Sequence, residues 1–363
     1  MHAISKISYI AIVDRERLPG VYNKITQTTK SLTELGYDAE HHVVFEGSKL
    51  GSAIKAFKLI WFSQADTIIY RHSIYTFLLF FAFIRQRIKE TKIIIDIPTP
   101  SSVTLIEIYN TTDSSRVEKA IRIALIAATA PWSLWPATKI IQYAPENIYF
   151  SLGLRKKTTL SSNGINVNNI DPRKGFPRWP DKNFFLIGVA SIANWHAFDR
   201  VIRGMAEYNK KSTSHNTVPH FIIVGDGPAR KALEDLVRTL NLESQVTFTG
   251  YKSGASLNVL YTHAHIGVAS LGLYRKGLSM ASDLKSREYA ARGLPFICAG
   301  HDFDFDPTPD FVLKFANNDS YIDIEKTMNW YSTISFDHEV CESIRCYAVE
   351  RLDFSMKVKE IVE

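Results

Sequence analysis

A short segment near residue 285 combines a basic side chain, a carboxylate and the start of a helix. Its sequence is Asp283-Leu284-Lys285-Ser286-Arg287-Glu288. Ser282 and Asp283 are both good N-caps, and Gly293 is a typical helix end. The first amides of this helix, at Leu284 and Lys285, would act with the helix dipole and the Lys285 ammonium to bind an anion such as a diphosphate. Glu288 would then reach a hydroxyl-rich group on that diphosphate, which suggests an enzyme that uses nucleotide sugars.

Two further segments of the C-terminal half could contact the same ligand. Gly225 and Gly227 follow a predicted strand, and glycine permits both a positive φ and the close approach of a ligand. The alternative is that a strand–turn–helix junction needs these glycines for packing alone. His196 lies where another strand meets its helix, a place where phosphate or sugar groups bind. Its alternative role is that of a capping or surface histidine.

A basic pair precedes the helix of Glu288. Arg275 and Lys276 are expected to join Lys285 around the diphosphate as fixed cations. Because a departing diphosphate gains negative charge in the transition state, such cations lower the barrier directly. A solvated basic loop is the alternative interpretation.

The C-terminal half also resembles a known enzyme family. The sequence LKSREYAARGLPFI at 284–297 resembles the EAMAxGxPV-type signature of the family 4 retaining glycosyltransferases, which have the GT-B fold. The order of the Gly225 segment and the VTFTG sequence at 246–250 is similar to the nucleotide-binding half of that family. The resemblance implies that Glu288 accepts hydrogen bonds from ribose hydroxyls and that Tyr251 lies beside the base.

Two positions depart from the family pattern. The family commonly has an Arg and a Lys after the first strand of this half, and His196 stands at about the Lys position. The family also has a Glu-x7-Glu pair, but Met280 stands eight residues before Glu288, and a gapped alignment puts Arg275 there instead. The first carboxylate is absent in either case. The predicted catalytic residues are therefore Lys285, Lys276, Arg275 and His196.

Polar residues near strand ends in the N-terminal half are candidates to contact the acceptor or the donor sugar. They are Arg71, His72, Asp96 and Thr99. In a GT-B enzyme these strand ends lie at the edge of a cleft between the domains. Gly20, between the first strand and the first helix, is predicted to present its amide to the donor there, with loop sterics as the alternative.

No metal ion and no cofactor are predicted. Asp302, Asp304 and Asp306 alternate with Phe, which favours an extended, half-buried segment over a cation site. In GT-B enzymes, helix termini and basic side chains bind the diphosphate without a metal.

The elements that position these residues alternate between strands and helices. This alternation predicts an α/β fold with parallel sheets and crossover helices. With the resemblance, it predicts two Rossmann-like, doubly wound domains that face a cleft. We expect an acceptor-binding domain at 1–165, a nucleotide-sugar-binding domain at 166–342, and a final helix within 343–363 that crosses back onto the N-terminal domain. The strands that carry candidate residues are predicted at 7–13, 67–70, 92–97, 139–142, 184–189, 220–224, 246–250 and 266–269.

Size and composition fit two globular domains. The chain has 363 residues, of which 45% are apolar and 22% charged. The three cysteines have no metal-binding spacing, which favours a reducing compartment. The sequence predicts neither a signal peptide nor a membrane span, so a cytoplasmic protein is expected. No nucleic-acid partner is predicted.

Basic residues are concentrated in the N-terminal half. Residues 1–170 contain 20 Lys and Arg against 13 Asp and Glu, and the apolar run at 74–84 ends in Arg85 and Arg87. That run is either a buried helix with a solvated basic end or part of a membrane contact. The charge favours peripheral contact of this domain with an anionic membrane, at the inner face of the plasma membrane.

These observations predict a glycosyltransferase, and the family resemblance implies that it retains the anomeric configuration. It would move a sugar from a nucleotide-sugar donor to a hydroxyl of a glycan or polyprenyl-linked acceptor, in bacterial surface-polysaccharide synthesis. One alternative is a nucleotide-sugar epimerase on the same scaffold. Another is a sugar-nucleotide-binding protein that has lost catalysis, which the missing first Glu makes credible.

Overall fold

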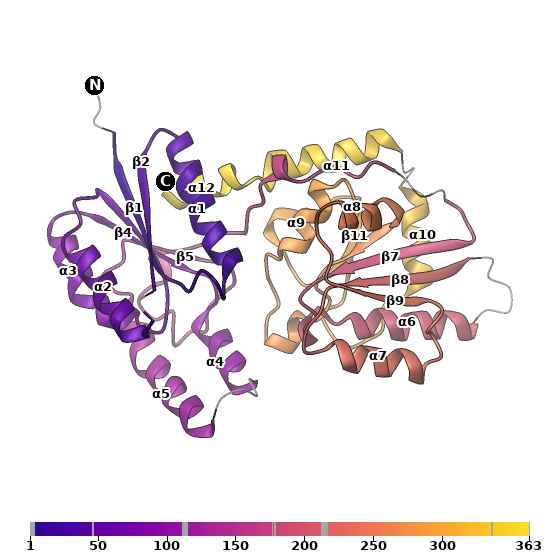
Figure 1. Ribbon diagram of the computed structural model, residues 1–363, viewed down its shortest axis with the longest axis horizontal. Helices are drawn as coiled ribbons and strands as arrows, with labels where there is room; N and C mark the ends of the chain where they lie inside the picture. The colour runs from indigo at the N-terminus through magenta and orange to yellow at the C-terminus, as the bar shows by residue number, and fades with distance from the viewer. Residues whose placement is uncertain are drawn as a thin grey trace. The chain divides into compact units, whose positions relative to one another are not determined.

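The chain forms two compact units in a computed structural model (Figure 1). The structure describes residues 4–45, 47–110, 115–175, 177, 179–211, 217–334 and 337–362. The first unit contains Met1–Ser162 and Phe354–Glu363, and the second contains Asn163–Asp353. Each unit is built on one parallel sheet of six strands, as the alternation of strands and helices predicts.

The sheet of the first unit has the strand order β2-β1-β3-β4-β5-β6. Its strands are β1 (Lys6–Ile12), β2 (Asp38–Val44), β3 (Thr67–Arg71), β4 (Lys92–Ile97), β5 (Lys139–Gln142) and β6 (Thr158–Leu160). Its helices are α1 (Pro19–Glu34), α2 (Lys49–Trp61), the 3-10 turn η1 (Thr76–Leu79), α3 (Phe80–Ile88), α4 (Ser101–Asn110), α5 (Arg116–Ser133), η2 (Arg155–Lys157) and α12 (Phe354–Val362).

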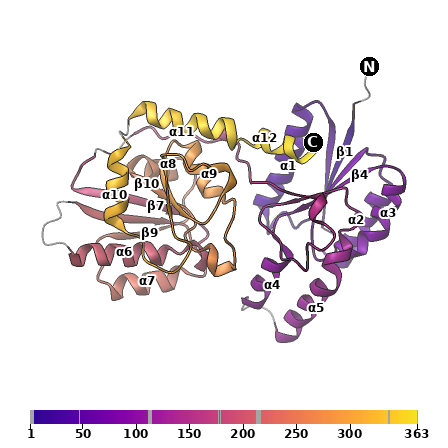
Figure 2. The same ribbon diagram turned by 180° about the vertical axis from the view of Figure 1, so that it is seen from behind.

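Helices cover both faces of this sheet, so its strands are apolar on both sides (Figures 1 and 2). Successive residues of β4 show the alternation: Ile93 and Ile95 pack with α2 and α3, whereas Ile94 packs with α1 and α12. Asp96 points to the same face as Ile94, and it brings a carboxylate into an otherwise apolar layer.

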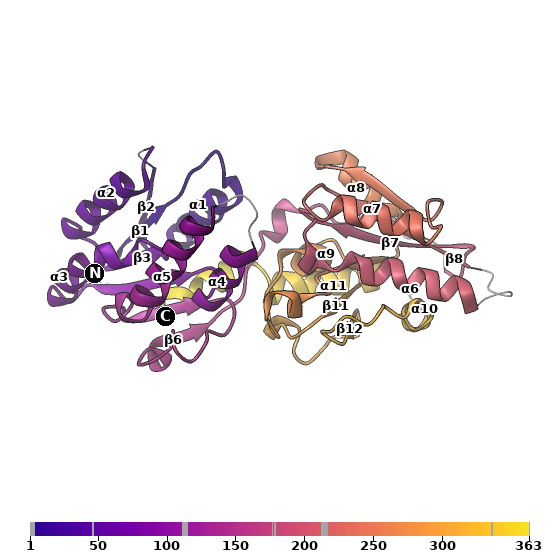
Figure 3. The same cartoon turned by 90° about the horizontal axis from the view of Figure 1, so that it is seen from below.

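The sheet of the second unit has the order β12-β11-β10-β7-β8-β9 (Figure 3). Its strands are β7 (Asn183–Val189), β8 (Val218–Val224), β9 (Val246–Gly250), β10 (Ile266–Val268), β11 (Phe296–Ala299) and β12 (Val312–Phe315). Its helices are α6 (Phe198–Lys211), α7 (Arg230–Thr239), α8 (Gly254–His263), α9 (Leu284–Ala291), α10 (Ile324–Thr333) and α11 (His338–Arg351). The 3-10 turns η3 (Val167–Asn169), η4 (Asn194–His196), η5 (Leu273–Lys276) and η6 (Phe303–Phe305) complete it.

The predicted single helix at the C-terminal end of the chain is wrong. The structure has two helices there, α11 in the second unit and α12 in the first. They separate at Asp353, whose Oδ2 accepts a hydrogen bond from the Val167 amide and which pairs with Ile165 in an isolated bridge. Phe354, Val358 and Ile361 of α12 then join the core of the first unit. The domain boundaries at 165 and 342 stay predictions.

Gly20 lies inside a helix, not in the loop predicted for it. Helix α1 begins at Pro19, which is well suited to a first helical position because it needs no amide partner. Gly20 is therefore in the first turn, and a Cβ built on it would meet nothing within 4 Å.

No helix in the described parts of the chain is long and apolar enough to cross a membrane.

Candidate functional site

The polar residues of the second unit meet where its strand order reverses. Consecutive strands run outward in opposite directions from β7 and β10, which lie side by side in the sheet. The loop after β7 carries His196, and the loop after β10 carries Ser270 and Lys276. Ligands of open α/β sheets bind at the carboxyl ends of strands at such a reversal. The fold therefore brings these residues to the expected binding edge.

Lys285 is the centre of a compact polar cluster. Its Nζ lies 3.1 Å from His196 Nδ1, 3.0 Å from Ser270 Oγ and 3.8 Å from Asp283 Oδ2. The side chain is 14% exposed, so it is largely buried but still reaches solvent. Burial lowers the pKa of Lys285, and the Asp283 carboxylate offsets part of that effect. The ammonium is thus held in one orientation before any ligand binds.

Of the two predicted N-caps, Asp283 is the one that caps helix α9. Its Oδ1 accepts hydrogen bonds from the amide and hydroxyl of Ser286, and its Oδ2 accepts one from the Ser270 amide. Burial alone would raise the pKa of Asp283, but Lys285 and the hydrogen bonds outweigh it and lower the pKa. The cap satisfies the third amide of the helix. The amides of Leu284 and Lys285 have no acceptor among the described residues, and Leu284 is exposed.

His196 is a neutral hydrogen-bonding partner and not a cation. Its Nε2 lies 3.0 Å from the Ser191 carbonyl oxygen, so Nε2 donates, and Nδ1 accepts from Lys285. Burial and the positive charge of Lys285 lower the pKa of His196 to about 3. His196 therefore stands near the position of the missing lysine but orients Lys285 without adding charge.

This neutral histidine predicts a pH-dependent loss of stability. The unfolded chain binds a proton on His196 near pH 6.5, but the folded chain does so only near pH 3, so stability falls as the pH falls between these values. Glutamine does not titrate, so His196→Gln is expected to lose about 1 kcal/mol less stability than the parent protein between pH 7 and pH 5. The effect is no larger because the ring is only partly buried. Urea unfolding at both pH values measures this, and equal losses in the two proteins would contradict it.

Lys276 extends the basic surface beside this cluster. Its Nζ lies 3.9 Å from the centroid of the Trp195 ring, a cation–π contact. Trp195 belongs to η4, the turn that also holds His196, and its carbonyl oxygen accepts a hydrogen bond from the Gly272 amide. The positive charge of Lys276 is close enough to lower the pKa of both Lys285 and His196.

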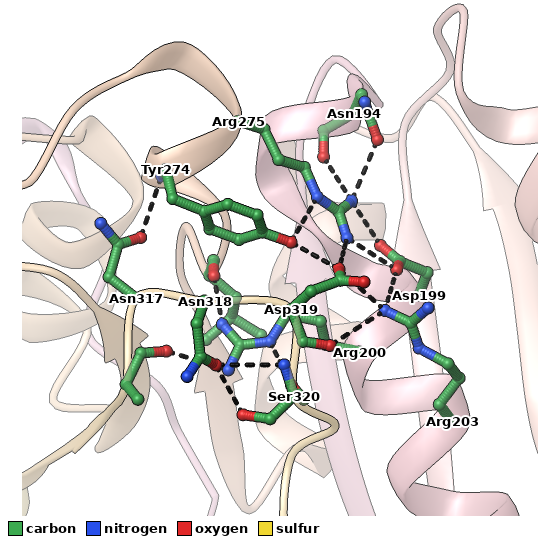
Figure 4. Close-up of polar contacts among 12 residues, drawn as sticks. Asn194, Asp199, Arg200, Arg203, Tyr274, Arg275, Asn317, Asn318, Asp319 and Ser320 are labelled. Atoms are coloured by element: carbon green, nitrogen blue, oxygen red, sulfur yellow. Dashed lines mark hydrogen bonds and ion pairs between the residues drawn. The ribbon is translucent and has the colours of Figure 1, made fainter.

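Arg275 is paired with carboxylates and also bonds Asn194 of η4 (Figure 4). Its guanidinium bonds both oxygens of Asp199, at 2.8 and 2.9 Å, and Asp319 Oδ1 at 2.7 Å. These bonds outweigh burial and raise the pKa of Arg275. The expectation that Arg275 joins Lys285 and Lys276 therefore finds no support in its contacts. It fixes η5 against the start of α6, and its catalytic role stays a prediction.

Glu288 lies one turn after Lys285 on the same helix. Its Oε1 accepts hydrogen bonds from Arg292 Nε at 3.0 Å and from the Tyr261 hydroxyl at 3.2 Å. The side chain is 29% exposed, and its hydrogen bonds within the described chain all fall on Oε1. A carboxylate fixed through one oxygen can accept a ligand hydroxyl on the other, which suits the predicted contact with a ribose.

Gly225 and Gly227 have a packing role in this structure. They have φ values of 118° and 157°, and the loop after β7 lies against them. A Cβ on Gly225 would lie 1.9 Å from the Ala190 carbonyl oxygen, and one on Gly227 would lie 2.5 Å from that of Ile192. The packing alternative thus explains both glycines, and their contact with the donor stays a prediction. Tyr251, the predicted neighbour of the base, is 80% exposed.

Gly225→Ala is expected to destabilise the second unit by about 2–4 kcal/mol, because the methyl group meets backbone atoms that cannot move aside. Gly20→Ala is the matched control, since its Cβ has free space and its helix gains about 0.5–1 kcal/mol. Thermal unfolding of both variants tests this. Equal melting temperatures would contradict the packing role.

The aspartates at 302 and 304 belong to an ion pair. Arg287 bonds the carboxylates of Asp302 and Asp304, and Asp302 also caps η6. Within the ranges that the structure describes, no group of three metal-ligating side chains could hold a metal ion.

The candidates of the first unit separate into two places. Arg71 Nη1 bonds Asp96 Oδ2 at 3.1 Å, and the Tyr9 hydroxyl donates to the same oxygen at 2.6 Å. Lys24 of α1 lies nearby, with its Nζ 3.9 Å from the centroid of the Tyr143 ring. Burial lowers the pKa of Lys24 to about 8, while Asp96 opposes that shift. Asp96 and Arg71 thus form part of a buried charge cluster at the carboxyl ends of β3 and β4.

His72 and Thr99 instead line a pocket of about 210 Å³. His72 Nδ1 lies 2.9 Å from Thr76 Oγ1, and burial lowers the pKa of His72 to about 4, so the ring is neutral. The pocket is lined by His72, Ser73, Ile74, Thr76, Phe77, Pro98, Thr99, Ser101, Thr104, Ile126, Thr129, Ala130 and Ser133. Hydroxyl groups and a neutral imidazole suit an uncharged, hydroxylated ligand.

Several site residues have no clear signal in the sequence. The contacts of Ser270 with Asp283 and Lys285 emerge only when β10 and α9 pack together. Tyr9 and Lys24 join Asp96 only through the fold. One signal does exist, because a single aspartate interrupts the apolar run of β4 and such a residue needs a buried partner.

The middle of the chain matches a known family in sequence. Residues 170–299 match the family described as "Glycosyl transferases group 1". This range contains His196, Lys276, Lys285 and Glu288. No curated protein sequence matches the chain significantly.

Solved structures match nearly the whole chain. A glycosyltransferase from Rickettsia africae ESF-5 matches with a TM-score of 0.63 and 12% identity, over 99% of this chain and 97% of that one. The lipopolysaccharide outer core galactosyltransferase WaaB matches with a TM-score of 0.59 and 12% identity, over 98% and 97%. Anabaena HepE in complex with UDP-glucose matches with a TM-score of 0.56 and 15% identity, over 98% of both chains. The chain thus has the GT-B fold with two Rossmann-like domains, which confirms the predicted fold class.

Proposed function

We propose that this protein is a retaining glycosyltransferase. It moves a sugar from a nucleoside-diphosphate sugar to a hydroxyl of a lipid-linked glycan. The observation that carries the proposal is the basic cluster of Lys285 and Lys276 beside neutral His196, at a strand-order reversal within the range that matches glycosyl transferases group 1. Because cations at such an edge bind anionic leaving groups, this arrangement fits a diphosphate.

In the proposed reaction the diphosphate leaves toward Lys285. The bond between the sugar C1 and the diphosphate oxygen breaks while the acceptor oxygen bonds C1 on the same face. The acceptor proton goes to the departing diphosphate, so no protein nucleophile is needed. The negative charge that grows on the leaving oxygen is stabilised by Lys285, Lys276 and the open amides of α9. Retention rests on the family resemblance, and no metal ion takes part in the proposal.

The donor and the setting follow from chemistry and likeness. Glu288 would accept hydrogen bonds from ribose hydroxyls through its second carboxylate oxygen. HepE was solved with UDP-glucose, which supports a UDP-sugar as the first donor to test. WaaB is a lipopolysaccharide outer core galactosyltransferase, which supports surface-polysaccharide synthesis at the cytoplasmic face of the plasma membrane as the setting. The pocket of His72 and Thr99 is the proposed place of the acceptor sugar.

A panel of nucleotide sugars tests the proposal in two steps. The true donor should raise the melting temperature, since a ligand at about 100 times its dissociation constant adds roughly 2.7 kcal/mol. Product analysis with that donor should then show free nucleoside diphosphate and an extended glycan. The new linkage should have the donor's anomeric configuration, and a chelator of metal ions should not change the result. An epimerised donor would indicate an epimerase, and stabilisation without turnover would indicate a binding protein. No stabilisation by any nucleotide sugar would overturn the proposal.

A further inference from the structure

Helix α3 has an apolar face that points to solvent. Ala82, Phe83 and Gln86 are its buried residues, and they pack toward the sheet. On the opposite side Phe81 is 72% exposed, Ile84 37% and Ile88 79%. With about 3.6 residues per turn, these three side chains share one face. A helix on the surface of a soluble protein normally places polar residues there, so this exposed face needs an explanation.

Basic side chains flank this face on both sides. On the helix, Arg85 and Arg87 lie at its two margins. Arg85 is held in place, because its guanidinium lies 4.6 Å from the Trp61 ring centroid and bonds the Trp61 carbonyl oxygen. Burial and, to a smaller extent, the nearby charge of Arg87 lower the pKa of Lys157, whose Nζ donates to the Trp135 carbonyl oxygen.

Elements next to α3 also carry exposed apolar side chains. The Trp135 side chain is 56% exposed, and the Phe62 side chain, just after α2, is 69% exposed. The sequence of α3, FFAFIRQRI, contains no acidic residue, and the nearest carboxylate along the chain is that of Glu90 beyond the helix end. We call Phe81, Ile84, Arg85, Arg87 and Ile88 the α3 face. Helix α2 lies beside α3 and supports it (Figures 1 and 3).

We propose that the α3 face docks onto the surface of an anionic phospholipid bilayer. Apolar side chains at the centre would enter the boundary between headgroups and acyl chains, while the flanking arginines remain at the level of the lipid phosphates. Charge complementarity favours this occupant over a second copy of the chain, because a two-fold contact would bring the arginines of both copies together. The proposal deepens the membrane contact of the proposed function by naming its surface.

Vesicle sedimentation with the full chain tests the proposal directly. We expect binding to phosphatidylglycerol-containing vesicles, weak binding to pure phosphatidylcholine, and weaker binding at higher salt. Phe81→Ser with Ile88→Ser should weaken partitioning at least about tenfold through the loss of buried apolar area. Lys89 is the exposed residue that follows the last turn of α3. Arg87→Glu with Lys89→Glu should weaken partitioning to a similar degree, about tenfold, and reduce its salt dependence.

Matched variants of the second unit complete the test. Val259→Ser with Val349→Ser removes two exposed apolar side chains from α8 and α11, and Lys210→Glu changes an exposed charge on α6. Both should bind vesicles like the parent protein, with unchanged circular dichroism in every variant. Equal losses in the control variants, or no binding by the parent, would overturn the proposal. Self-association in sedimentation velocity that Phe81→Ser with Ile88→Ser abolishes would also overturn it, in favour of a dimer. Glycosyl transfer is measured separately, so either proposal can fail while the other stands.

Discussion

Replacing Lys285 with methionine is expected to lower kcat for the true donor about 100- to 1,000-fold, because losing one preorganised group at the developing charge costs about 2.7–4 kcal/mol. The fold should survive, since Asp283 keeps its hydrogen bonds from Ser286 and Ser270. Release of nucleoside diphosphate, followed under saturating donor, measures the effect on kcat.

Two comparison variants make this result specific to the reacting charge. Lys210→Met removes an exposed lysine from α6 of the same unit and should leave kcat unchanged. Ser270→Ala removes one hydrogen bond to Lys285 while the charge remains, so a loss of about tenfold or less is expected. If Lys285→Met turned over the donor at the parental rate with a normal melting temperature, the leaving group would lie elsewhere.

The largest stability effect is expected at Arg287, whose side chain is completely buried. It bonds both oxygens of Asp302 and also bonds Asp304, and its Nε donates to the Asn163 carbonyl oxygen at 3.0 Å. Arg287→Met leaves two nearly buried carboxylates without their counter-charge, which costs about 3–5 kcal/mol. Urea unfolding followed by circular dichroism measures the loss.

Two further variants serve as controls for the Arg287 result. Arg238→Met removes an arginine whose partner Asp235 is exposed, so a change under about 0.5 kcal/mol is expected. Adding Asp302→Asn and Asp304→Asn to Arg287→Met should recover part of the stability, because the uncompensated charges are then gone. A triple variant as unstable as the single one would show that packing of the arginine, and not its charge, maintains this region.

Elements built from continuous β-branched residues could be predicted from the sequence alone. The predicted bounds of β4, β5 and β9 agree with the structure residue for residue, because runs such as Lys-Ile-Ile-Ile-Asp-Ile are bounded by turn residues. The break between α11 and α12 could not be predicted in this way. It has no glycine or proline at Leu352 or Asp353, and it depends on tertiary hydrogen bonds to Ile165 and Val167.

The candidate site shows the same limit. The cap at Asp283 and the position of Lys285 follow from local sequence, and the structure confirms the cap. The sequence displays the charge of Arg275 but not the partners of that charge. Asp199 and Asp319 are distant from Arg275 along the chain, and only the packing of η5 against α6 and against the segment after β12 brings them to the guanidinium. Counter-charges of this kind decide which basic residues remain available to a ligand.

Helix α12 has a consequence for how the protein is made. The first unit is discontinuous in sequence, because Phe354, Val358 and Ile361 complete a core that β1, β4 and α1 begin. On the ribosome this core stays open until the entire intervening unit has been translated. During that interval the emerging first unit exposes apolar surface that α12 later covers, so we expect it to bind chaperones. For the same reason we expect residues 1–162 to express poorly as a separate fragment.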